Sequence, residues 1–194
     1  RFAFQIGAVD KPNQRRVNKV PMPTLGGLAI FIAFTFSTMF LLRDQMPTQQ
    51  LWGLFGGECI IVAEGMIDDV FELSPKQKIL GQLLAALEVY FVAGVKMRYL
   101  TLPFIGVWHF GWLALPITLL WIVAIVNAIN LIDGLDGLAT GVSIIALTTT
   151  GITGLFFLNV ANTWVAIMIF ALVAAMLGFL PYNFFPARIY LGDT

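Results

Sequence analysis

The sequence predicts an all-α integral membrane protein, a polytopic helical bundle with about six spans. Of its 194 residues, 59% are hydrophobic and only 11% are charged, whereas soluble domains are about half apolar and about a quarter charged. The apolar residues also form separate runs, each close to the length of about 20 residues that a helix needs to cross a bilayer. These runs cover about 25–42, 51–67, 79–95, 112–130, 138–158 and 163–181. Basic and acidic residues are equal in number, so the net charge does not indicate nucleic acid binding.

The connections between the runs differ in their content of Lys and Arg. Because cytoplasmic connections are enriched in basic residues, this difference predicts the orientation of the chain. The side that holds the N-terminal loop carries eight basic residues and the other side three, so the first side is expected to be cytoplasmic. The eight are Arg1, Lys11, Arg15, Arg16, Lys19, Lys76, Lys78 and Arg188, and the three are Arg43, Lys96 and Arg98.

Most acidic residues fall on that same side. Clustered carboxylates repel one another unless a cation binds between them, and Mg²⁺ is the usual cation for oxygen ligands at a phosphate site. Loops that are distant in sequence are therefore expected to converge on a metal–phosphate site at the cytoplasmic face. The acidic residues of this side are Asp10, Asp68, Asp69, Glu72, Asp133, Asp136 and Asp193.

The first two connections contain recognisable helix starts. Pro21 and Pro23 stiffen the entry to the first span, and the pair 26–27, both glycine, is expected to let that span pack closely against another helix. Pro75 suits the first position of a later helix, with Ser74 as its N-cap. Four basic residues of the first loop either anchor the chain to the membrane surface or bind a phosphate or lipid headgroup.

The connection between the third and fourth runs is expected on the opposite side of the membrane. Alternation around Pro103 and Gly106 predicts a short external hairpin. His109, the single histidine, follows Trp108 there, and this pair is interpreted as an interfacial anchor because the other candidate residues lie on the cytoplasmic side.

A polar motif separates the fourth and fifth runs. Asn127, Asn130 and Asp133 are three residues apart and therefore share one face of a helix. Gly134 and Gly137 allow the backbone to turn and a ligand to approach closely. A simple polar turn is the alternative, but it needs fewer groups that can bind a metal or a nucleotide, and polar groups near a membrane are costly.

The last segment continues this pattern. Two prolines and a glycine are expected to end the last span at its cytoplasmic end. The residues that then face the acidic cluster are Asn183, Arg188, Tyr190 and Asp193. Tyr190 either stacks on a base or anchors the chain at the membrane interface.

These residues together resemble the polyprenyl-phosphate N-acetylhexosamine-1-phosphate transferase family. The resemblance rests on four motifs that follow one another over the whole chain, and the stretch from Asp68 to Lys78 is similar to the branch that uses UDP-N-acetylglucosamine. The motifs are the loop that ends in Gly26-Gly27, the Asp68-Asp69 pair, the polar motif from Asn127 to Gly137, and Pro181-Tyr182-Asn183 leading to Gly192-Asp193-Thr194.

The resemblance implies a Mg²⁺-dependent phosphoglycosyl transferase of the cell membrane, with Mn²⁺ as an alternative metal. Its donor would be a UDP-sugar and its acceptor undecaprenyl phosphate, both at the cytoplasmic face, and it would form a homodimer. By family analogy Asp193 is the metal ligand. The catalytic candidates are Asp68, Asp69, Asp133 and Asp136, and the substrate-binding candidates are Lys19, Thr24, Asn127, Asn130, Asn183 and Tyr190.

Other functions fit the sequence less well. A phospho-N-acetylmuramoyl-pentapeptide transferase belongs to the same family, but more often has Thr before the Asp that corresponds to Asp133. A transporter would place its acids along a pathway in mid-membrane. A CDP-alcohol phosphotransferase would need Ala-Arg shortly after Asp133-Gly134, where this chain has Gly137-Leu138 instead. We expect residues 1–194 to be one transmembrane catalytic domain, and a fragment that lacks the family's first span and C-terminal part.

Overall fold

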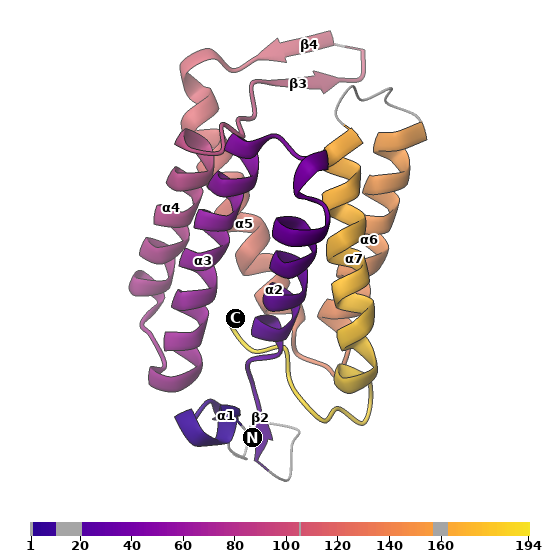
Figure 1. Ribbon diagram of the computed structural model, residues 1–194. Helices are drawn as coiled ribbons and strands as arrows, with labels where there is room; N and C mark the ends of the chain where they lie inside the picture. The colour runs from indigo at the N-terminus through magenta and orange to yellow at the C-terminus, as the bar shows by residue number, and fades with distance from the viewer. Residues whose placement is uncertain (1, 11–20, 105, 157–162) are drawn as a thin grey trace.

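The computed structural model describes residues 2–10, 21–104, 106–156 and 163–194. In this part of the chain the helices run side by side as a bundle, with a β-hairpin at one end and both chain termini toward the other (Figure 1). The all-α prediction is therefore confirmed. The long helices are α2 (Gly26–Phe36), α3 (Thr48–Phe71), α4 (Pro75–Phe91), α5 (Ala114–Ile132), α6 (Leu138–Phe156) and α7 (Thr163–Asn183).

Short elements join these helices. Helix α1 (Phe2–Ile6) precedes β1 (Val9–Asp10), which pairs antiparallel with β2 (Met22–Pro23). A π-helical turn, η1 (Ser37–Leu41), extends α2, and the 3-10 turns η2 (Arg43–Gln45) and η3 (Gly111–Leu113) lead into α3 and α5.

The helices match the predicted runs in order. By length and composition, three described stretches can cross a membrane, namely Gly111–Ile132, Leu138–Phe156 and Thr163–Asn183. Gly26–Leu41 forms a shorter apolar helix. A polytopic membrane protein is thus supported, while the number of six spans stays a prediction.

Several predicted boundaries are shifted, and two of these shifts have a clear cause. Helix α4 begins at Pro75 rather than near residue 79, because the Ser74 amide and hydroxyl donate to Gln77 Oε1 at 2.9 and 2.7 Å and fix the helix start there. This agrees with the predicted roles of Ser74 and Pro75. Helix α7 runs through Pro181 to Asn183, because the missing amide falls in its last turns and the Phe184 amide still bonds Leu180 O at 2.8 Å.

The predicted hairpin is present. Strands β3 (Tyr99–Leu102) and β4 (Gly106–His109) pair antiparallel with Tyr99 opposite His109. Gly106 has φ +92°, a conformation that side chains disfavour. The hairpin marks the end of the bundle that lies away from the two termini (Figure 1).

The glycine pair at the start of α2 allows a close approach, as predicted, but its main partner is an extended segment. A Cβ on Gly27 would lie 2.2 Å from the Thr194 carbonyl carbon. A Cβ on Gly26 would lie 2.3 Å from the Phe179 ring of α7 and 2.6 Å from Tyr190 O. Only glycine therefore admits residues 190–194 beside α2.

Backbone hydrogen bonds hold that segment in place. The Tyr190 amide donates to Pro23 O at 2.9 Å, and the Gly26 amide donates to Tyr190 O at 3.0 Å. The Gly27 amide donates to Leu191 O at 2.9 Å. The chain end that carries Asp193 is thus fixed to the first turn of α2.

Candidate active site

Asp193 lies where four separate parts of the chain meet. Lys78, in the first turn of α4, donates to Asp193 Oδ2 at 3.1 Å. Asn130, near the end of α5, donates to Asp193 Oδ1. The amide of Asp193 itself donates to Oδ1 of Asp69 at 3.2 Å, so the last turn of α3 completes the group. The convergence that the sequence predicted for these acids is therefore present.

Asp68 sits deeper in the same cluster. Its Oδ1 accepts the Leu73 amide at 2.7 Å, and its Oδ2 forms an ion pair with Lys78. The Asp68 side chain is 4% exposed, whereas the Asp193 side chain is 35% exposed. Asp193 can thus meet a ligand from solution, while both oxygens of Asp68 are engaged within the protein.

The two carboxylate oxygens of Asp69 differ in their contacts. Its Oδ2 is buried and has no hydrogen-bond partner among the described residues. A Cβ on Gly192 would lie 2.7 Å from this oxygen, and Gly192 has φ +78°. Glycine at position 192 therefore allows the turn before Asp193 and leaves room for the Asp69 carboxylate.

Among the described residues, the cluster has more acidic than basic side chains. Lys78 is the cation that these residues place between Asp68 and Asp193. Burial by itself would raise the pKa of Asp193, but hydrogen bonds with Asp68, Asn130 and Lys78 outweigh burial and lower this pKa below its ordinary value. Asp193 is therefore held as an anion, ready for a cationic ligand.

Asp133 is the C-cap of α5, and its pKa is shifted in the opposite direction to that of Asp193. Burial, with added repulsion from Asp193 and Asp136, raises the pKa of Asp133 to about 6. An unfolded Asp ionises near about 3.9. Between these values the folded state binds more protons than the unfolded state, so this group lowers stability as the pH rises through that range.

Asp133→Asn should therefore stabilise the protein in a pH-dependent manner. We expect the gain in Tm over wild type to grow from about pH 4 to about pH 6 and to level off above, because the neutral amide avoids the cost of ionisation. Thermal unfolding in detergent with a chelator, at about pH 4, 5 and 7.5, measures this gain. A gain that does not change with pH would contradict the assignment.

Two further predicted residues hold the loop that carries Asp193. Asn183, 1% exposed at the end of α7, accepts from the Thr140 hydroxyl at 2.9 Å and donates to Ile189 O at 3.1 Å. Asp136 Oδ2 accepts the Ala187 amide at 2.9 Å. These contacts fasten residues 184–189 to the start of α6, and the predicted substrate and catalytic roles of Asn183 and Asp136 stay predictions.

Thr140→Val should loosen this fastening. The valine keeps the shape of a fully buried side chain but leaves Asn183 Oδ1 without its donor, which costs about 1–3 kcal/mol. Chemical unfolding in detergent should show this loss. Thr149→Val is the matched control, because the Thr149 hydroxyl is exposed and bonds only within its own helix. Equal losses in the two variants would argue against the role of Thr140.

Three of the other candidates are among the described residues. Thr24 is buried before α2, and its hydroxyl has no partner among the described residues. Asn127 donates to Gln82 of α4 and to Val123 O, which ties α5 to α4. Tyr190 is half-buried beside the first turn of α2. Lys19 lies outside the described residues.

The sequence prediction missed two residues of this region. Lys78 was part of a recognised motif but was not counted among the site residues, although its place in the first turn after the Ser74 cap puts it beside the Asp68-Asp69 pair. Thr140 had no signal, because a threonine in an apolar helix is common and its partner Asn183 is distant in sequence.

The donor set suits a metal ion that is shared with a ligand. In the described part of the chain, no three His, Cys, Asp or Glu side chains are arranged to hold a metal ion by themselves. Mg²⁺ in phosphate sites is commonly bound through one or two carboxylates together with phosphate oxygens. The exposed Asp193 carboxylate, with the neighbouring Asp69 carboxylate, fits that smaller requirement.

Comparison with known proteins identifies the family of the chain. The model of the family described as glycosyl transferase family 4 matches residues 51–194. A probable undecaprenyl-phosphate N-acetylglucosaminyl 1-phosphate transferase of Bacillus subtilis is 42% identical over the whole chain and 53% of its own length. A phospho-N-acetylmuramoyl-pentapeptide-transferase of Levilactobacillus brevis is 37% identical over 89% of the chain and 56% of its own length.

A third relative is named for decaprenyl phosphate. The decaprenyl-phosphate N-acetylglucosaminephosphotransferase of Mycolicibacterium smegmatis is 34% identical over the whole chain and 51% of its own length. The chain thus spans about half the length of these curated relatives. The family match covers three quarters of the chain, including every acidic residue of the cluster around Asp193, and the chain therefore belongs to glycosyl transferase family 4.

Proposed function

We propose that the protein transfers N-acetylglucosamine 1-phosphate from UDP-N-acetylglucosamine to undecaprenyl phosphate at the cytoplasmic face of the cell membrane and releases UMP. The observation that carries this proposal is the meeting of α3, α4 and α5 with Asp193 at one end of an apolar bundle. The name and the full-chain similarity of the Bacillus subtilis relative support this branch of the family.

The reaction is a phosphoryl transfer. An oxygen of the lipid phosphate attacks the β-phosphorus of the donor, the bond from that phosphorus to the UMP oxygen breaks, and UMP leaves with the electron pair. A phosphate monoester has a second pKa of about 6, so the attacking oxygen is already ionised near neutral pH and needs no general base. The protein has mainly to align two anions and offset their charge.

The residues of the cluster suit these tasks. Mg²⁺, with Mn²⁺ as an alternative, would supply the positive charge that offsets the diphosphate, and Asp193 is the residue proposed to hold it. Asn130 and Lys78 fix the orientation of the Asp193 carboxylate. Asp68, whose carboxylate is buried, in turn holds the half-buried Lys78 ammonium at the site through an ion pair. Lys78 also places a positive charge beside the expected phosphates.

Further parts of the proposal rest on the sequence. Lys19, Thr24, Asn127 and Tyr190 are proposed to contact the donor, by the match of their motifs to the family. The cytoplasmic location rests on the distribution of basic residues between the two sides. A homodimer stays a prediction.

Release of UMP by the purified protein tests this function. We expect release in detergent to require UDP-N-acetylglucosamine, undecaprenyl phosphate and Mg²⁺ together, and a chelator to abolish it. Release with UDP-muramyl-pentapeptide but not with UDP-N-acetylglucosamine would keep the reaction and change the donor. This donor is the second candidate because relatives are named for that activity. No release with either donor, from folded protein that contains the family's full length, would refute the proposal.

A further inference from the structure

We propose that the hairpin end of the bundle, away from Asp193, binds the phosphate group of an anionic phospholipid. A cavity of about 390 Å³ opens there between the end of α4, strand β4 and the beginning of α5. Its lining residues are Tyr90, Lys96, Arg98, His109, Gly111 and Ala114.

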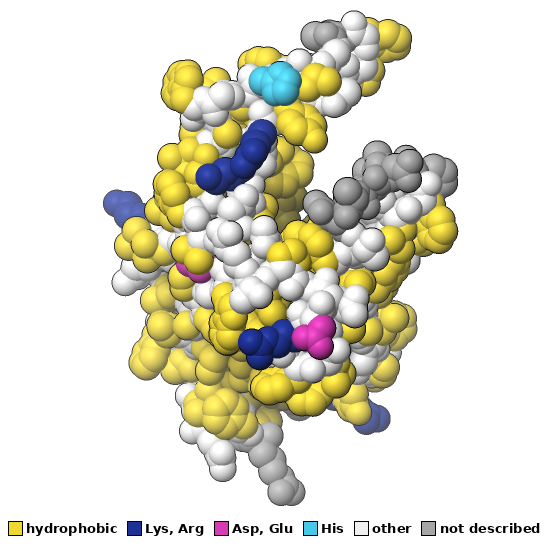
Figure 2. Space-filling view, turned by 45° about the horizontal axis from the view of Figure 1, so that its top comes forward, with side chains coloured by type: hydrophobic (Ala, Val, Ile, Leu, Met, Phe, Trp, Pro, Cys, Tyr) yellow, Lys and Arg dark blue, Asp and Glu magenta, His cyan; other side chains and the backbone are white. Residues whose placement is uncertain are grey.

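The charge of this cavity favours an anion. Lys96 and Arg98 are exposed, the lining contains no acid, and neither side chain has an acidic partner in the described part of the chain. Lys96 Nζ lies 4.7 Å from the centre of the Tyr90 ring, which orients the ammonium at the cavity. Dark blue basic side chains lie beside the cyan histidine at this end (Figure 2). A phosphate here would meet two cations and the imidazole of His109, which can donate a further hydrogen bond.

The backbone holds these side chains at a fixed spacing. The Met97 amide, between the two cations, donates to the Thr118 hydroxyl at 3.0 Å, and this buried hydroxyl donates to Ala114 O at 2.6 Å. The Phe110 amide donates to Arg98 O at 2.9 Å, so Arg98, just before β3, lies next to the end of β4 that carries His109. The site is therefore largely formed before a ligand arrives, which lowers the entropic cost of binding.

The surroundings favour a lipid over a soluble anion. Large apolar side chains next to the cavity residues in sequence are strongly exposed, including Phe91 at 61%, Trp108 at 55% and Trp112 at 83%. Exposed aromatic residues beside basic residues are typical of a membrane–water interface. A phospholipid can place its phosphate on Lys96 and Arg98 while its acyl chains follow the exposed apolar surface of α4 and α5.

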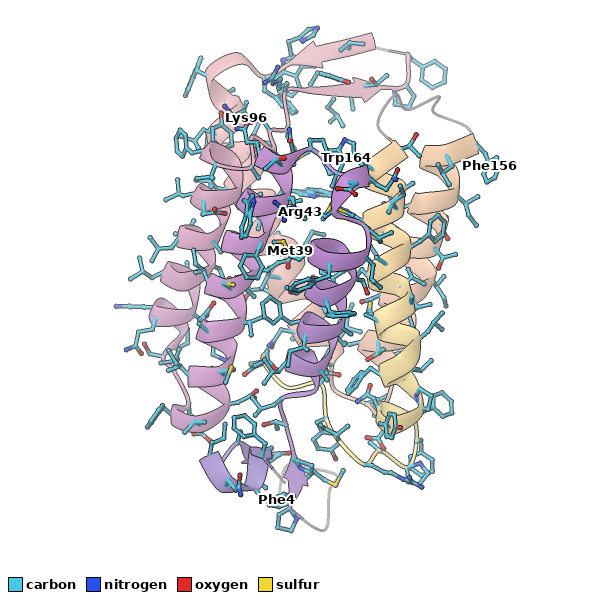
Figure 3. The ribbon with its side chains drawn as sticks, in the orientation of Figure 1. Phe4, Met39, Arg43, Lys96, Phe156 and Trp164 are labelled. Carbon is cyan, nitrogen blue, oxygen red and sulfur yellow. The ribbon has the colours of Figure 1, made fainter. Side chains whose placement is uncertain are left out.

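This site is separate from the candidate active site. Gln49, in the first turn of α3, donates to Val92 O beside the cavity, whereas Asp68 lies near the other end of the same helix. These two residues are roughly 28 Å apart along the helix axis at 1.5 Å per residue. Figure 3 shows Lys96 at the hairpin end. A lipid bound there would not touch the cluster around Asp193.

Retention of lipid by the purified protein tests the proposal. Delipidated protein would be mixed with equal amounts of phosphatidylglycerol and phosphatidylcholine, and bound lipid counted by native mass spectrometry. We expect wild type to prefer phosphatidylglycerol, and the double variant Lys96→Gln, Arg98→Gln to bind it about tenfold more weakly and hold one molecule fewer per chain.

Two controls make the result specific. Arg43→Gln removes an exposed cation at the same end that does not line the cavity (Figure 3), and should leave retention unchanged. The charge-conserving pair Lys96→Arg, Arg98→Lys should retain the lipid, which separates loss of charge from misfolding. Equal retention by the double variant and wild type overturns the proposal. Binding of inorganic phosphate with equal retention of the two lipids overturns the assignment to a lipid.

Discussion

Asp193→Asn is expected to lower the turnover of UMP release by about 1000-fold, the range seen when a main electrostatic group of an active site is removed. The amide keeps the size of the side chain and can still accept from Lys78 or Asn130. It loses the negative charge that the proposed metal needs, so turnover falls while the fold persists. Steady-state turnover at saturating substrates and Mg²⁺, together with the thermal unfolding curve, measures the two effects separately.

The same change at Asp68 provides the comparison. Asp68→Asn should cost turnover only about 10- to 100-fold, because the Asp68 carboxylate is buried against the Leu73 amide and Lys78 and orients rather than contacts a ligand. Its effect should include a loss of stability, since Lys78 loses a buried partner. Equal losses of turnover in the two variants, with unfolding curves that match wild type, would place Asp68 in direct contact with the reacting groups.

Gly65→Ala is expected to cost about 100-fold in turnover although the site gains no charge and loses none. A Cβ on Gly65 would lie 2.2 Å from the carbonyl oxygen of Asp193 and 2.6 Å from the Cα of Thr194. Backbone atoms cannot rotate away as a side chain can, so either α3 or the segment that carries Asp193 must shift. A displacement of about 1 Å at a reacting group can lower a rate by about 100-fold.

Gly178→Ala is the matched control for this variant. Gly178 also lies inside a long helix, α7, but a Cβ there would have no heavy atom within 4 Å. Alanine should therefore leave turnover unchanged and raise stability by up to about 1 kcal/mol, because it is the better helix former. Turnover of Gly65→Ala equal to that of Gly178→Ala would show that Asp193 does not depend on close contact with α3.

The sequence predicted the local structure because local rules govern it. Apolar runs of membrane-spanning length predicted the helices, the Ser74-Pro75 pair predicted the start of α4, and alternation around Gly106 predicted the hairpin. Boundaries were less certain. Helix α4 starts earlier than its apolar run because its polar first turn is fixed by a cap.

The candidate site was predictable in its composition but not in its contacts. The distribution of charges between the two sides predicted that Asp68, Asp69 and Asp193 lie on one face. The structure confirms that they are in one cluster, connected by contacts with Lys78 and with the Asp193 amide. Which carboxylate is buried and which is exposed depends on how deep each residue lies in the bundle. Sequence spacing contains no information on this depth.

The sequence by itself determined that this protein is an apolar helical bundle with most of its acidic residues gathered at one end. Only the tertiary structure decided that Lys78 joins the cluster, that Asn183 and Asp136 fasten the Asp193 loop, and that α2 begins against residues 190–194. The physical reason is that α2 and α7 are apolar on all faces. Their pattern therefore does not distinguish an inward face, and close backbone contacts at glycines select the packing instead.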